Sequence, residues 1–151
     1  MKHDLRPVPL RRTYAWAAIA LAAWLVRLDY AKGAKAVEPI RFARGASSAE
    51  VRGAVVRGER ALYGLEARAG QRMSVRIAAP ERNAVFQIYA PGAQPERREI
   101  GLEVAGRALS SAGEGDDARR WTGVLPQSGA YMLVVGATRG NATYQLTVEI
   151  R

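Results

Sequence analysis

The stretch GVLPQSGAYMLVVGATRGNA, residues 123–142, decides the fold of this chain. Its centre alternates between two apolar sets, which are Tyr131, Leu133 and Val135 on one side and Met132 and Val134 on the other. This alternation predicts a strand that is covered on both of its faces. Turn residues lie at both ends of the strand, as PQSG at positions 126–129 and as TRGN at positions 138–141.

Outward from this strand, the chain beyond residue 39 breaks into short apolar runs that glycine-rich turns separate. We expect strands over residues 40–43, 50–56, 60–67, 73–78, 84–90, 100–104, 119–125, 131–135 and 144–150. The sixth of these lies in an irregular region, residues 93–111, where prolines and glycines weaken the strand pattern. Eight or nine short strands without an amphipathic helix predict an all-β fold, an antiparallel β-sandwich of jelly-roll-like type.

The N-terminal leader, residues 1–36, differs in composition from the rest of the chain. Its first part carries the positive charges Lys2, Arg6, Arg11 and Arg12. The apolar run that follows, residues 14–26, is shorter than the roughly 20 residues of a membrane span and has the length of a secretory signal core. The triplet Ala34-Lys35-Ala36 predicts a cleavage site after Ala36.

Two features of the leader fit an uncleaved anchor instead. Arg27 directly follows the apolar run, and Ala36 lies ten residues beyond Val26. We therefore expect residues 1–36 to be a signal peptide or an N-terminal anchor and residues 37–151 to be one exported domain. The domain is then periplasmic or secreted, and it touches a membrane only if the leader is retained.

Several kinds of catalytic and metal site are excluded by composition. The chain has no cysteine, and its single histidine, His3, lies in the leader, so thiol chemistry, serine-histidine catalysis and histidine-bound zinc are unavailable to the domain. The acids Glu114, Asp116 and Asp117 lack the spacing of a calcium loop and indicate a solvated loop. No two acids lie at a spacing that we can place in one cleft, so we expect no enzyme, no cofactor and no metal.

The charge of the domain is lower than that of the whole chain. The net charge is +9, but seven of the 23 basic and two of the 14 acidic residues lie in the leader. Residues 37–151 therefore hold 16 arginines, no lysine and 12 acids, a net charge of +4. Because the arginines are scattered among acids rather than gathered in one run, we expect no nucleic-acid partner.

The order of the turns resembles that of the periplasmic inhibitors of g-type lysozyme. The segments that carry the resemblance are FARG at 42–45, Ser47-Ser48, Gly53, Gly58, Tyr63, AGQ at 69–71, YAPG at 89–92, LP at 125–126, Ser128-Gly129, Tyr131 and TRGNA at 138–142. The resemblance spans nearly all of residues 40–150. Bacterial pre-peptidase C-terminal domains, which are also small exported β-sandwiches, share the LP-x-SG-x-Y part, but the chain has room for one free-standing domain and no peptidase.

The resemblance implies a sandwich that inserts loops into the substrate cleft of a lysozyme. Motif matching places the partner-binding residues at Ser128, Gly129, Tyr131, Arg139, Gly140 and Asn141. A lysozyme cleft holds a carboxylic acid, and arginine suits it because a guanidinium donates two parallel hydrogen bonds and keeps its charge. From the residues alone, Arg139 is equally an ordinary solvated turn arginine, Ser128-Gly129 an ordinary turn, and Tyr131 a core residue with its hydroxyl at the rim.

A second function stays open at this point. The pre-peptidase-like turns also fit a module that binds peptidoglycan or another glycan of the cell envelope without inhibiting an enzyme. Exposed aromatic side chains at Tyr89, Trp121 and Tyr144 would support that alternative.

Overall fold

The computed structural model describes residues 36–99 and 101–151, and the predictions made for the leader, apart from Ala36, lie outside these residues. The described residues contain no helix, and hence none that could cross a membrane. They form ten strands, which are β1 (Glu38–Pro39), β2 (Ser48–Val55), β3 (Arg60–Ala67), β4 (Arg72–Ala78), β5 (Ala84–Tyr89), β6 (Gln94–Arg98), β7 (Gly101–Ala105), β8 (Arg120–Val124), β9 (Gly129–Ala137) and β10 (Ala142–Ile150).

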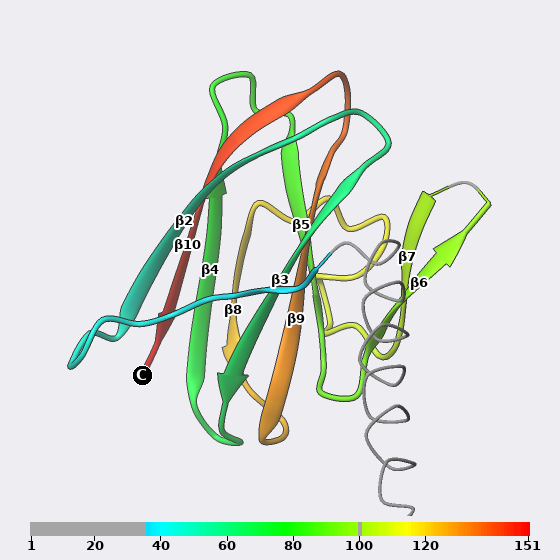
Figure 1. The fold of residues 1–151 in the computed structure, drawn as a ribbon. Coiled ribbons are helices and arrows are strands. Elements are labelled where there is room, and N and C mark those ends of the chain that lie inside the picture. The colour runs from blue at the N-terminus through cyan, green and yellow to red at the C-terminus, as the bar shows by residue number, and fades with distance from the viewer. Residues whose placement is uncertain (1–35, 100) are drawn as a thin grey trace, which may run out of the picture. The chain divides into compact units, whose positions relative to one another are not determined.

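The strands form two four-stranded sheets and a separate hairpin (Figure 1). One sheet, sheet A, has the order β1-β3-β9-β5, and the other, sheet B, has the order β2-β10-β4-β8. All pairs are antiparallel except the short parallel pair of β1 and β3. The third sheet is the β6–β7 hairpin, seen to the right of the sandwich in Figure 1. The predicted all-β sandwich is confirmed.

The hydrophobic core lies between the two sheets, and β9 contributes to it as its alternation predicts. Tyr131, Leu133 and Val135 point into the core, where they join the inward residues of β4 and β10. On the other face of β9, Met132 and Val134 are also buried, in a second cluster that includes partly buried residues of the β7 strand. The prediction that β9 is covered on both of its faces is therefore confirmed.

Two parts of the strand prediction are wrong. Residues 40–43 form no strand, because pairing with β3 ends once the Ile40 amide has donated to the Gly64 carbonyl (2.8 Å) and the chain then leaves the sheet. The irregular region 93–111 holds two strands instead of one. The sequence pattern misses β6 because this strand, QPERR, has no apolar alternation and gains its order from pairing with β7.

The turns gather at the two ends of the sandwich. One end holds the β2–β3, β4–β5 and β9–β10 turns, at the top of Figure 1, and the other holds the β3–β4 and β8–β9 turns. We call residues 138–141, between β9 and β10, the arginine turn, and residues 126–129, which lead into β9, the serine turn. This arrangement decides which of the predicted site residues share a surface.

Candidate functional site

The arginine turn is held from below by a buried asparagine. Asn83 is 1% exposed, and its side-chain Nδ2 donates to the carbonyl oxygens of Arg139 (3.0 Å) and Asn141 (2.9 Å). The Asn83 carbonyl in turn accepts the backbone N–H of Thr138 (2.9 Å). Three hydrogen bonds from one residue of the β4–β5 turn therefore fix the backbone of the arginine turn, and the polar atoms of a buried side chain are satisfied in doing so.

Two further contacts tie the arginine turn to its neighbours. Nη2 of Arg139 donates to the Glu81 carbonyl (2.8 Å), the one hydrogen bond that this guanidinium makes with the described residues. Asn141 Oδ1 accepts the backbone N–H of Arg57 (3.1 Å) in the β2–β3 turn. Gly140 takes the left-handed conformation, with φ of 55°. The side-chain amide of Asn141 therefore joins the arginine turn to the β2–β3 turn, and Gly140 supplies the left-handed backbone conformation.

Arg139 itself remains exposed. A guanidinium carries five N–H donors in a planar fork, so most of them stay free to bind a partner. Among the described residues no carboxylate lies within ion-pair distance of Arg139. The structure thus presents a permanent positive charge without an ion-pair partner among the described residues, on a turn that six hydrogen bonds to two neighbouring turns hold in place.

A polar pocket of about 220 Å³ lies beside the arginine turn. Its wall includes Thr138, which precedes Arg139, and the acids Glu114 and Asp117 of the loop before β8. Arg60 reaches Glu114 only at 3.9 Å and donates to Gln87 (3.3 Å). The described residues hold no group of acids and histidines arranged to bind a metal ion.

The serine turn serves the architecture of the sandwich. Ser128 Oγ accepts the backbone N–H of Ala69 (2.9 Å) and so joins the β8–β9 turn to the β3–β4 turn. Gly129 has φ of 137°, and a Cβ there would lie 2.9 Å from Cβ of Pro91, so this position requires glycine. The Tyr131 ring is buried in the core, and its hydroxyl donates to the Gln127 carbonyl (2.6 Å).

The six predicted partner-binding residues do not share one surface. Arg139, Gly140 and Asn141 follow β9, whereas Ser128 and Gly129 lie at its beginning and Tyr131 lies inside the core. A strand of nine residues spans about 27 Å at the usual rise of about 3.4 Å per residue. Arg139 and Ser128 therefore lie near opposite ends of β9, and of the six predicted residues Arg139 is the one that carries a charge.

Comparison with solved structures identifies the family. The crystal structure of PliG from Aeromonas hydrophila, a periplasmic lysozyme inhibitor of g-type lysozyme, is 35% identical to this chain with a TM-score of 0.57, over 76% of this chain and 96% of that chain. The chain belongs to the PliG family. The resemblance seen in the sequence is thereby confirmed.

Two more PliG structures share the fold. PliG from Salmonella Typhimurium is 24% identical, with a TM-score of 0.51 over 75% of this chain and 96% of that chain. A mutant of PliG from Escherichia coli is 21% identical, with a TM-score of 0.50 over 77% of this chain and all of that chain. No family model matches the chain, and no curated protein matches it.

In this PliG-family domain, the aromatic residues that would support a glycan-binding module are not available as a group. Tyr89 and Tyr144 are buried, at 7% and 3% exposure. Trp121 is half-buried, and its Nε1 donates to the Ser110 carbonyl (2.9 Å). The expectation of exposed aromatics is therefore wrong for both tyrosines, because Tyr144 points into the core between the sheets and Tyr89 is covered by the second cluster on the other face of sheet A.

Sequence reasoning missed the residue that fixes the PliG-family arginine turn. Asn83 stands just before β5, where asparagine is an ordinary turn residue, and nothing local links it to positions 55 or more residues away. The one available signal was the position of Asn83 directly before an apolar strand, because an asparagine that is buried there needs hydrogen-bond partners. Those partners are backbone atoms, which carry no sequence signature.

Proposed function

We propose that this domain is an exported inhibitor of g-type lysozyme and that Arg139 is the residue that enters the acidic substrate groove of the enzyme. Membership of the PliG family supports the class of target, because a g-type lysozyme inhibitor is 35% identical to this chain. The observation that carries the role of Arg139 is its exposure on a turn whose backbone Asn83 fixes. The three PliG structures are those of inhibitors rather than enzymes.

The chemistry of the groove explains why arginine suits this position. A glycosidase cleft carries carboxyl groups that act on the glycosidic bond. A guanidinium binds a carboxylate through two parallel charge-assisted hydrogen bonds, and it stays charged when it is buried. Because the one hydrogen bond that the Arg139 guanidinium makes with the described residues goes to a carbonyl, the Glu81 oxygen, binding an enzyme carboxylate breaks no ion pair with them.

The fixed backbone adds to the affinity. A loop that is already ordered loses less conformational entropy when it enters a cleft than a loop that binding must order. Hydrogen bonds from Asn83 and to the Asn141 side chain hold the arginine turn before any partner arrives. Export to the periplasm or beyond, which the leader predicts and which the periplasmic relatives support, would place the inhibitor where it meets a lysozyme.

An inhibition assay tests the proposal. The full chain is expressed in bacterial cells with its leader in place, purified, and titrated against g-, c- and i-type lysozymes. Truncating one partner of a buried charged pair costs about 2 to 5 kcal/mol, so Arg139→Ala should weaken inhibition of the g-type enzyme about 30-fold or more. Arg139→Lys keeps the charge but loses the planar fork, so it should restore inhibition only in part.

Arg68→Ala is the matched control, because Arg68 is an exposed arginine in the β3–β4 turn at the opposite end of the sandwich. It should inhibit like the wild type. Absence of inhibition by the wild type at micromolar concentration would exclude the function. Equal inhibition by Arg139→Ala and the control would leave the function in place and exclude this residue.

A further inference from the structure

The positive charge of the domain is concentrated on one pair of neighbouring strands. The segments 72–78 and 119–125, which contain β4 and β8, carry Arg72, Arg76, Arg119 and Arg120 and no acid. The other residues of 37–151 hold 12 arginines and 12 acids, so their charges balance. The excess of four positive charges therefore comes from these two segments, three of the arginines lying on β4 and β8 themselves at one edge of sheet B and Arg119 directly before β8.

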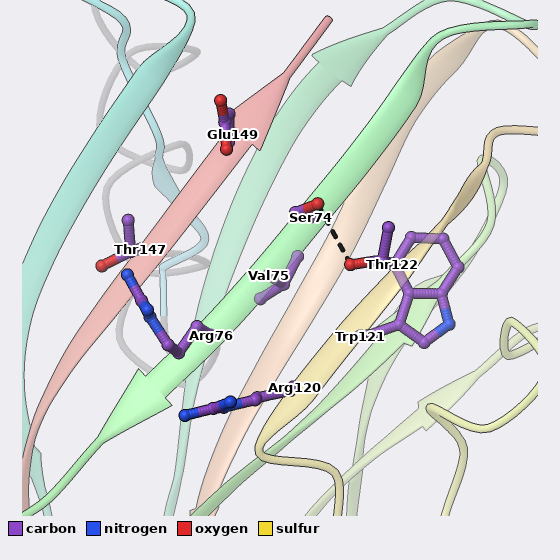
Figure 2. Close-up of a pocket in the computed structure, with 8 residues that line it drawn as sticks. All are labelled: Ser74, Val75, Arg76, Arg120, Trp121, Thr122, Thr147 and Glu149. Atoms are coloured by element: carbon purple, nitrogen blue, oxygen red, sulfur yellow. Dashed lines mark hydrogen bonds between the residues drawn. The ribbon is translucent and has the colours of Figure 1, made fainter.

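Two of these arginines lie opposite each other on neighbouring strands. Arg76 on β4 pairs in register with Arg120 on β8, and both are exposed on the outer face of sheet B (Figure 2). Like charges that are directly opposite on neighbouring strands destabilise a sheet. Neither arginine forms an ion pair with a described residue. Packing and pairing within the domain thus give no reason for this arrangement.

The surroundings of the pair supply further hydrogen-bonding groups. Arg76 and Arg120 line an open pocket of about 230 Å³ together with the hydroxyl residues Ser74, Thr122 and Thr147. Ser74 and Thr122 share a hydrogen bond of 3.1 Å, as Figure 2 shows. The one acid of the pocket, Glu149, is paired with Arg151 at 2.6 Å and so leaves the arginine charges uncompensated.

We propose that this pocket, the Arg76–Arg120 site, binds a phosphate group. Two guanidinium groups that line one pocket offer donors that phosphate oxygens accept, and an anion bound between them would offset the repulsion between their charges. Hydroxyl groups can donate to the remaining oxygens. The pocket is open to one side, on a sheet face, so it suits a phosphate that stays attached to a larger assembly such as the headgroup of an anionic lipid as well as free phosphate.

This site is separate from the proposed inhibitory residue. Arg139 belongs to the turn between β9 and β10, whereas the two arginines come from the middle of β4 and the beginning of β8. Trp121, whose indole Figure 2 shows directed away from both arginines, donates its Nε1–H to the Ser110 carbonyl instead. Phosphate binding and lysozyme inhibition can therefore be lost independently.

The test uses the full chain and two phosphate sources. Binding is measured to phosphatidylcholine vesicles with and without phosphatidylglycerol, and to inorganic phosphate by nuclear magnetic resonance titration of the arginine side chains. The double variant Arg76→Gln, Arg120→Gln is compared with Arg44→Gln, Arg97→Gln, which loses the same charge at exposed positions outside the site. We expect the first double variant to bind phosphate at least tenfold more weakly, and the second to bind like the wild type.

The outcomes separate the sources and the alternatives. If the Arg76→Gln, Arg120→Gln variant loses binding to the phosphatidylglycerol vesicles but still binds inorganic phosphate like the wild type, the ligand is a lipid phosphate. If it loses binding to inorganic phosphate alone, the ligand is free phosphate. The melting temperature of the site variant should equal or exceed that of the wild type, because repulsion between the arginines is removed. No binding by the wild type to either source, equal binding by the two double variants, or a lower melting temperature of the site variant would overturn the proposal.

Discussion

Replacing Asn83 by alanine removes the side chain that fixes the arginine turn. The variant loses two side-chain hydrogen bonds, to the carbonyl oxygens of Arg139 and Asn141, while the backbone bond to Thr138 stays. A hydrogen bond contributes about 0.5 to 1.5 kcal/mol net, and a buried acceptor that loses its donor costs more. We expect the free energy of unfolding to fall by about 2 to 3 kcal/mol.

Thermal unfolding followed by circular dichroism measures this loss. For a domain of this size, about 1 kcal/mol corresponds to roughly 4 °C, so Asn83→Ala should melt about 8 to 12 °C below the wild type. The control is Asn141→Ala, which removes one exposed hydrogen bond, that from the Arg57 amide. This control should lose no more than about 4 °C, because an exposed group that loses its partner bonds to water instead.

The same variant tests whether a fixed turn matters for inhibition. At a temperature well below its melting point Asn83→Ala is folded, but its arginine turn has lost two anchors and must be ordered on binding. Fixing the backbone of one residue costs about 1 to 2 kcal/mol, so inhibition of the g-type enzyme should weaken about tenfold or more. A melting temperature within about 2 °C of the wild type would refute the anchoring, and unchanged inhibition would refute its role in binding.

Three further predictions concern parts of the sandwich away from the arginine turn. A Cβ at Gly53 would lie 2.6 Å from the hydroxyl oxygen of Tyr144, so Gly53→Ala should lower stability by about 1 to 3 kcal/mol in urea denaturation. Burial raises the pKa of the Tyr63 and Tyr144 hydroxyls, which share a hydrogen bond of 2.6 Å, above the unfolded value of 10.0. The unfolded state then ionises first, so stability should be constant below about pH 10 and fall as pH rises beyond it, and less steeply in Tyr63→Phe, Tyr144→Phe. Ser128→Ala removes only the hydrogen bond from the Ala69 amide, so it should cost about 1 kcal/mol in the same assay and leave lysozyme inhibition unchanged.

The fold could be predicted where each strand carries its own periodic pattern. Alternation in β9 and β10 places their inward residues, and the structure buries them as expected. The β6 strand could not be predicted, because its residues are polar and proline-containing and their order comes from pairing with β7. Residues 40–43 show the opposite error, because the sequence predicts a strand there and the chain leaves the sheet after one hydrogen bond, from the Ile40 amide to the Gly64 carbonyl.

The candidate site also has features that the sequence predicts and one that it does not. The sequence marks Arg139 because an arginine stands in a short turn after a strong strand, and exposure follows from that position. Separation of this turn from Ser128 could also be inferred, since one strand of nine residues joins them and holds its ends apart. The role of Asn83 could not be inferred from the sequence, because its side chain donates to backbone carbonyls of residues far along the chain.

The distribution of charge gives the two proposed sites different physical characters. Outside the segments 72–78 and 119–125 the arginines and acids of the domain are equal in number, and within the arginine turn Arg139 is the one charged residue. In the proposed inhibitor complex, recognition through Arg139 depends on short-range hydrogen bonds and on a fixed backbone, and salt affects buried pairs little. At the Arg76–Arg120 site the charge is exposed and uncompensated, so attraction of an anion acts over a longer range and is screened by salt. The two proposed sites therefore differ in how strongly binding at each should depend on the salt concentration.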